Sequence, residues 1–285
     1  MTWVIFALTT ALSLSTADAL SKRALQHTDD LVIVWVREGY ALPFLALAFL
    51  FVPVPKLDTV FWITVAGLVP LEIISLVLYI KAIRLSPLSL TVPFLALSPV
   101  FIIFTAFAFL GELPDRSGVL GILLITVGAY TLNASASAQG ILGPVKAILK
   151  EPGSILMLVV AVIYSVTSTL GKVAVQHSSP VFFGFFYPFT LTVVLTIFLG
   201  ARGKLGHVFS KPAVFIPIGL STATMIISHF IAISMTQVAY MIAVKRTSLV
   251  FSVVYGWLLF KEEKIKERLV GSGLMLAGMV MILAF

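Results

Sequence analysis

Ser98-Pro99-Val100-Phe101 leads to Leu110-Gly111-Glu112, and 150 positions later Ser248-Leu249-Val250-Phe251 leads to Phe260-Lys261-Glu262. An apolar stretch with spaced glycines follows each motif, from Gly121 to Gly128 and from Gly271 to Gly278. An internal repeat of this length indicates that one structural unit occurs twice. Because both copies are almost entirely apolar, the sequence predicts a duplicated bundle of membrane-spanning helices, an arrangement common among transporters.

The composition also points to a protein that lies in lipid. Of the 285 residues 60% are hydrophobic and 11% are charged, whereas a soluble domain has roughly 25% charged residues. The net charge of +7 is assigned to loop residues at the membrane face, so no nucleic-acid partner is expected. The absence of cysteine excludes disulfides, thiolate metal sites and cysteine nucleophiles.

Apolar stretches of about 20 residues, the length that crosses the hydrocarbon core, occur ten times. The N-terminus lacks the basic region of a secretory signal, so the first stretch is interpreted as a span. The predicted spans are 3–22, 31–51, 59–80, 87–109, 116–134, 154–175, 181–200, 213–235, 240–260 and 267–284. A longer connection over 135–153 divides the chain into repeats of five spans, 1–134 and 154–285. Five is odd, so the repeats have opposite orientations, and the fold class is an all-α polytopic bundle of two inverted repeats.

Lysine and arginine concentrate in the loops after the odd-numbered spans. By the positive-inside rule, these loops are cytoplasmic and both termini lie outside. The expected location is the cell membrane, with a prokaryotic plasma membrane favoured.

The repeat motifs resemble a known family. The second copy runs from Ala243 to Phe251 and from Gly256 to Glu262, and the first ends in Leu110-Gly111-Glu112 before Gly118, Gly121 and Gly128. These segments resemble the EamA module of the drug/metabolite transporter superfamily, and the resemblance covers the whole chain as two tandem modules. Arg37 also stands where that family often has an arginine.

The resemblance implies ten helices, alternating access and small organic substrates. It also implies a central cavity lined by spans one, three, four, six, eight and nine. Members of the superfamily commonly have cytoplasmic termini, opposite to the loop charges here. The first span has Asp18 near its end instead of the membrane-centred glutamate of the small four-helix relatives, which argues against their device for proton-coupled cation export.

Ionisable residues inside the spans are the candidate site, because each costs about 2.5–3.5 kcal/mol to insert. Lys245 and Arg246, adjacent in span nine, could form a cationic cradle for a carboxylate or phosphate, an internal ion pair, or snorkelling anchors. Glu72 follows Pro70 in span three and could balance these cations or carry a proton. The first repeat has Leu95 and Ala96 at the positions of Lys245 and Arg246.

Other charged residues favour gating or anchoring roles. Arg37 and Glu38 are interpreted as a structural or gating ion pair, with substrate binding as the alternative. Asp18 and Lys22 have the i, i+4 spacing of a helical ion pair. Lys172, the counterpart of Lys22, is expected to be an interface anchor.

Polar residues complete the candidate set. His229 is a packing residue or a proton relay, and Tyr79 and Tyr187 are interpreted as packing or membrane-interface aromatics. The predicted substrate-binding residues are Lys245, Arg246, Glu72, His229, Tyr164 and Ser228. The predicted gating or coupling residues are Asp18, Arg37, Glu38, Lys22 and Lys172. No metal cluster, cofactor motif or phosphate-binding Gly-Lys-Ser/Thr loop is found, which excludes ATP-driven transport by this chain.

We therefore expect a secondary transporter that exports a small polar metabolite such as an amino acid or organic anion. The alternative is a flippase for a lipid-linked sugar or phospholipid, which a lateral opening between spans would favour. An intramembrane enzyme is disfavoured, because no paired carboxylates or His/Asp cluster is seen. Membrane lipid and a small-molecule substrate are the expected partners and protons a candidate coupling ion, while the choice between monomer and homodimer stays open.

Overall fold

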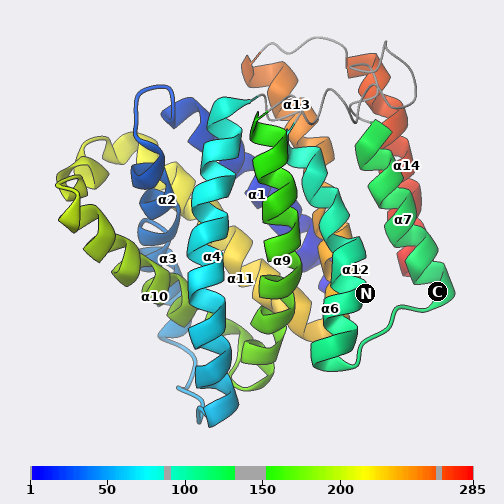
Figure 1. Ribbon diagram of the computed structural model, residues 1–285, viewed down its shortest axis with the longest axis horizontal. Coiled ribbons are helices and arrows are strands. Elements are labelled where there is room, and N and C mark those ends of the chain that lie inside the picture. Colours follow the sequence, from blue (N-terminus) through cyan, green and yellow to red (C-terminus); the bar gives the residue numbers. More distant parts are fainter. Residues whose placement is uncertain (1, 87–90, 132–151, 261–264, 285) are drawn as a thin grey trace.

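The computed structural model describes residues 2–86, 91–131, 152–260 and 265–284. Most of the predicted connection 135–153, together with Lys261 and Glu262 of the second repeat motif, lies outside the described residues. The secondary structure of the described residues consists of helices joined by loops, with no strand (Figure 1).

In the described ranges, ten helical segments correspond to the ten predicted spans. Five in the first half are α1 (Thr2–Ala24), α2 with α3 (Asp30–Gly39 and Leu42–Phe49), α4 (Thr59–Leu85), η1 with α6 (Val92–Leu97 and Ser98–Leu110) and α7 (Arg116–Thr131). Five in the second half are α9 (Pro152–Gln176), α10 (Pro180–Ala201), α11 (Pro212–Met235), α12 with α13 (Val238–Lys245 and Ser248–Phe260) and α14 (Ile265–Ala284). Seven are long and apolar enough to cross a membrane and three are shorter apolar helices. The predicted all-helical polytopic fold is confirmed.

Local sequence explains where several helices begin. The Asp58 carboxylate accepts the Phe61 backbone N–H at 2.9 Å as the N-cap of α4, and this bond lowers the pKa of Asp58. Ser179 caps α10 through the Phe182 N–H in the same way. Such caps satisfy backbone donors that the first helical turn leaves without partners.

Spans four and nine both depart from regular α-helical geometry before their middle. In span four a 3-10 segment ends at Leu97 and α6 begins at Ser98, and in span nine α12 ends at Lys245 and α13 begins at Ser248. The breaks lie at equivalent positions of the two repeats. Discontinuous helices of this kind are tolerated where the irregular backbone lines a cavity, and in transporters they commonly form the substrate site.

The two repeats are interlocked rather than side by side. Helix α1 packs along α11 and α4 along α9, which joins span one to span eight and span three to span six. The 150-residue offset relates span one to span six and span three to span eight. It therefore converts one helix pair into the other, as a pseudo-two-fold axis requires. Figure 1 shows α4 beside α9 in the centre of the bundle and α7 beside α14 at one edge.

Glycines bring α7 and α14 into backbone contact. A Cβ atom on Gly121 would lie 2.7 Å from the Gly278 carbonyl oxygen, and one on Gly128 would lie 2.7 Å from the Gly271 carbonyl oxygen. The helices therefore run antiparallel. The 150-residue offset relates Gly121 to Gly271 and Gly128 to Gly278, so it converts each of these contacts into the other. The repeat glycines quoted at the outset are thus the seam between the fifth and tenth spans.

We expect Gly278→Ala to destabilise the folded protein by about 1–3 kcal/mol through overpacking. The new Cβ would lie 2.6 Å from the Gly121 carbonyl oxygen and 2.9 Å from the Ile125 nitrogen, and neither backbone atom can yield cheaply. Gly273→Ala on the same helix is the matched control, since a Cβ there has nothing within 4 Å. Thermal unfolding in detergent measures both. Equal unfolding temperatures for the two variants would contradict this account of the seam.

Candidate functional site

A cavity of about 110 Å³ lies in the centre of the bundle. A water needs about 10–15 Å³ on this measure, so the cavity has room for a small organic solute. Spans one, three, four, six, eight and nine line it, as the resemblance implies. Spans two and seven contribute as well, through Arg37 and Glu38 of α2 and Tyr187, Pro188 and Leu191 of α10.

Equivalent positions of both repeats line the cavity. Six pairs related by the 150-residue offset face it: Leu14 and Tyr164, Arg37 and Tyr187, Glu38 and Pro188, Leu76 and Ile226, Tyr79 and His229, and Leu95 and Lys245. The cavity therefore lies where the two halves meet symmetrically. The paired residues differ in chemistry, so a symmetric scaffold encloses an asymmetric set of functional groups.

Five of the six predicted substrate-binding residues line this cavity. They are Glu72, Tyr164, His229, Lys245 and Arg246. Ser228 does not line it. Its side chain is buried and donates to the Thr224 carbonyl oxygen of its own helix. Neighbouring residues on a helix point about 100° apart, which explains why His229 reaches the cavity and Ser228 does not.

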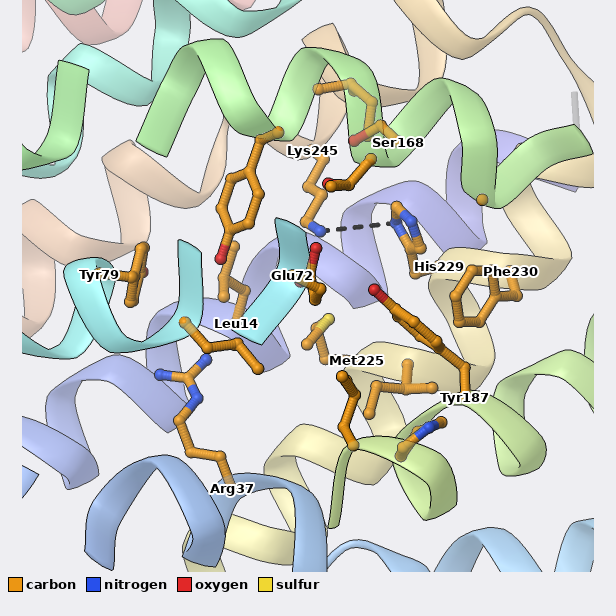
Figure 2. Close-up of a pocket in the computed structure, with 18 of the residues that line it drawn as sticks. Leu14, Arg37, Glu72, Tyr79, Ser168, Tyr187, Met225, His229, Phe230 and Lys245 are labelled. Atoms are coloured by element: carbon orange, nitrogen blue, oxygen red, sulfur yellow. Dashed lines mark hydrogen bonds between the residues drawn. The ribbon is translucent and has the colours of Figure 1, made fainter. Parts of the chain in front are cut away.

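Lys245 extends from the last turn of α12 into the cavity. Its Nζ atom lies 3.5 Å from Nδ1 of His229 on α11, so the ammonium group can donate to an unprotonated ring nitrogen. Figure 2 shows the Lys245 amino group, the His229 ring and the Glu72 carboxyl group converging there. Within the described part of the chain, no carboxylate forms an ion pair with Lys245 at 4 Å or less.

Glu72 reaches the cavity from α4, two residues after Pro70. Figure 2 shows the Tyr187 hydroxyl group directed toward Glu72 from the facing helix α10. No ion pair to Glu72 is found among the described residues. The sequence was interpreted to balance Arg246 with Glu72, but the structure gives Arg246 a different partner.

Arg246 binds across the bundle to Ser98. Its Nε and Nη2 atoms donate to Ser98 Oγ at 3.1 and 2.6 Å, and the hydroxyl group donates onward to the Leu95 carbonyl oxygen at 2.7 Å. Arg246 caps α12 and Ser98 begins α6, so this contact joins the two helix breaks. The sequence indicates Ser98 only as part of the repeat motif. Its contact with Arg246 cannot be predicted from spacing, because the two residues are 148 positions apart.

Arg37, which lines the cavity, forms a buried ion pair. Arg37 Nη1 donates to Asp18 Oδ1 at 2.6 Å, with the two side chains 4% and 1% exposed. The Tyr79 hydroxyl group donates to the other oxygen of Asp18, and the Arg37 guanidinium lies 5.5 Å from the centre of the Tyr79 ring. Tyr79 is therefore a polar partner and not simply a packing aromatic.

Two predicted ion pairs are wrong. Arg37 pairs with Asp18 and not with Glu38, which instead faces the cavity. Asp18 in turn does not pair with Lys22, whose ammonium group donates to the carbonyl oxygens of Ile83 and Ser86 at 2.9 and 2.7 Å. Spacing along one helix identifies local neighbours, but it cannot weigh them against charges on another helix.

Lys172 makes the same kind of backbone contact as Lys22, at the other end of the bundle. It donates to the Thr236 carbonyl oxygen at 2.7 Å, just as Lys22 donates to that of Ser86, and the offset relates Ser86 to Thr236. Lys172 also forms an ion pair with Glu112, whose second oxygen accepts the Val238 N–H at 3.0 Å. The predicted interface anchor is therefore wrong, since Lys172 is buried and tied to neighbouring spans.

Comparison with known proteins agrees with this architecture. The model of the EamA-like transporter family matches residues 1–134 and 151–284. A solved crystal structure is similar with a TM-score of 0.72 and 16% identity, covering 98% of this chain and 96% of the other; similarity at this identity concerns the fold alone. None of the curated proteins compared matches the sequence. With nearly its whole length matched by two consecutive copies of the family model, this multi-pass membrane protein belongs to the EamA-like transporter family of the drug/metabolite transporter superfamily.

Proposed function

We propose that this protein is a secondary transporter that exports an amino acid or a closely related small organic anion. One observation carries the proposal. The Lys245 ammonium group and the Glu72 carboxylate enter the same cavity from opposite repeats, yet they do not form an ion pair with each other.

Charges inside a membrane protein are costly and usually pair directly. A cation and an anion left apart in one cavity can be compensated by a ligand that carries the opposite charges. The carboxylate of an amino acid would bind Lys245, and its ammonium group would bind Glu72. Both contacts would be charge-assisted hydrogen bonds, the stronger class in proteins.

The remaining lining fits a small zwitterion with an apolar side chain. Apolar residues from two spans, Leu68 and Leu76 of α4 and Met225 of α11, face the cavity beside the charged groups. The Thr167 and Tyr164 side chains of α9 add hydroxyl groups. A few polar groups on a largely apolar wall are typical of small-molecule sites, where the polar groups fix orientation.

Alternating access would move the helices around this site. Lys22 and Lys172 each hold the ends of neighbouring spans together, at opposite ends of the bundle. We propose that these two contacts break in turn as each side of the cavity opens. The sequence has no nucleotide-binding loop, so transport would either be facilitated diffusion or be driven by an ion gradient. Protons are the candidate coupling ion, with Glu72 or His229 as their carriers. Export, cytoplasmic odd-numbered loops and a prokaryotic plasma membrane complete the proposal.

The test compares ligands that differ only in their charged groups. An apolar amino acid, the hydroxy acid of the same shape and the matching amine are added to purified protein, and the rise in unfolding temperature reports binding. We expect the amino acid to bind best. Glu72→Gln should weaken amino-acid binding about 10- to 100-fold, the range for a lost charged hydrogen bond, and leave hydroxy-acid binding nearly unchanged.

Two outcomes would contradict the proposal. In one, the amino acid and the hydroxy acid bind the unsubstituted protein equally, so that no group recognises the ammonium. In the other, Glu72→Gln and Lys245→Met each leave amino-acid flux into proteoliposomes unchanged.

A further inference from the structure

A second hollow lies on the outer surface of the bundle. It is an apolar groove of about 320 Å³ between α2, α4 and α10. Its walls are α4 between Ile73 and Leu78 and α10 between Val194 and Phe198, with Leu31 of α2 and Arg202 at its rim. We refer to it as the α4–α10 groove. It shares no lining residue with the central cavity. The groove is therefore separate from the proposed substrate site and is not a lateral opening into it.

The groove faces the hydrocarbon of one leaflet. Ile74, Val194 and Phe198 are 50%, 38% and 44% exposed, which in a spanning helix means exposed to lipid. From Val194 to Arg202 α10 rises about 12 Å, at 1.5 Å per residue, and half of the hydrocarbon core is about 15 Å. The groove therefore extends from near the bilayer centre to the interface, where Arg202 ends α10.

Arg202 is a cation without a carboxylate partner in the part of the chain that the structure describes. Its guanidinium lies over the Phe198 ring, 4.1 Å from the ring centre. Stacking holds the planar group in place and leaves its N–H edges free to bind an anion. The side chain is also exposed.

The nearby acidic residues are already neutralised. Asp29 forms an ion pair with Lys204 at 2.6 Å and Asp30 forms one with Arg84. Burial by itself would raise the pKa of Asp29, but hydrogen bonds from Lys204 and the Leu31 backbone outweigh it and the net shift is downward. Both carboxylates already have cationic partners, so the excess positive charge at the rim belongs to Arg202.

We infer that the α4–α10 groove binds an anionic glycerophospholipid, with an acyl chain along the apolar walls and the headgroup phosphate on Arg202. The charge at the interface end and the apolar wall along one leaflet match the two parts of such a lipid. A helix of a second copy of this chain fits less well. The groove has a volume of about 320 Å³ along a length of about 12 Å. Its width is therefore smaller than the diameter of a helix with its side chains, which is about 10 Å.

The test is native mass spectrometry of the purified full-length protein in micelles. Phosphatidylglycerol and phosphatidylcholine with identical acyl chains are supplied in equal amounts, and the ratio of the two retained lipids is measured. We expect phosphatidylglycerol to be favoured, and Arg202→Gln to reduce that preference about fivefold, the effect of one basic residue near an anionic surface. Arg23→Gln is the control, because Arg23 is exposed in the last turn of α1 and does not line the groove.

A second pair of variants tests the apolar wall. Ile74→Trp would fill the groove and should lower retention of both lipids, whereas Ile197→Trp, at a 70% exposed position outside the groove, should not. The inference is overturned if Arg202→Gln keeps the headgroup preference, or if Arg23→Gln lowers it equally. It is also overturned if Ile74→Trp abolishes a dimer mass while lipid retention persists, since a second copy would then be the occupant.

Discussion

Asp18→Asn is expected to lower the free energy of unfolding by about 3–5 kcal/mol, the cost of removing one partner from a buried ion pair. The substitution keeps the shape of the side chain and removes its charge. Arg37, 4% exposed and 2.6 Å from Asp18, would then be a buried cation without its counter-ion. The Tyr79 hydroxyl group would lose its charged acceptor as well.

Thermal or chemical unfolding in detergent measures this effect. Asp58→Asn is the control, because Asp58 pairs with His177 at the surface, where its side chain is 53% exposed and exposed pairs contribute little. The double variant Asp18→Asn with Arg37→Gln should lose less stability than the sum of the two single losses. Strictly additive losses, or a single variant as stable as the unsubstituted protein, would show that the pair does not stabilise the bundle.

Lys245→Met is expected to weaken binding of a carboxylate ligand about 10- to 100-fold, the range for a lost hydrogen bond to a charged group. The variant should fold normally, since replacing a buried charge by an apolar side chain of similar length removes a desolvation cost. The loss should be similar for the amino acid and the hydroxy acid, in contrast to Glu72→Gln, because both ligands carry the carboxylate.

Equilibrium binding and proteoliposome flux check this prediction. Lys56→Met is the matched control, as Lys56 is exposed in the loop before α4 and does not line the cavity. If Lys245→Met bound both acids as the unsubstituted protein does, Lys245 would not be the anion contact. The different responses of the two ligands to the two variants separate a carboxylate subsite from an ammonium subsite.

The repeat explains why the site is asymmetric. The cavity is lined by equivalent positions of the two halves, but Leu95 stands opposite Lys245 and Ala96 is the counterpart of Arg246. A perfectly symmetric cavity would present each charge twice, at twice the insertion cost. The duplicated scaffold supplies the moving helices, and differences between its copies provide the polarity that we propose for substrate recognition.

Much of the fold follows from the sequence alone. The ten spans were predicted within a few residues, because the length of an apolar stretch is set by the thickness of the bilayer. Five of the six predicted binding residues line the cavity, because a charge in a span has few stable places other than the interior. Tyr187 was interpreted as a packing or interface aromatic, although its alignment with Arg37 under the offset could have placed it in the cavity.

The partners of those charges could not be predicted in the same way. Asp18 forms its ion pair with Arg37 and not with Lys22, and Arg246 donates to Ser98 and not to Glu72. Each choice depends on the rotation of one helix against another to within a few ångströms, which no spacing along the chain records. The membrane class, the duplication and the inward position of most charges in the spans follow from the amino-acid sequence, since these depend on transfer from water to lipid. Among the described residues, the packing of the helices sets which inward charges neutralise one another and which have no ion pair. Electrostatic and hydrogen-bond energies depend on distances between helices that are far apart in the chain.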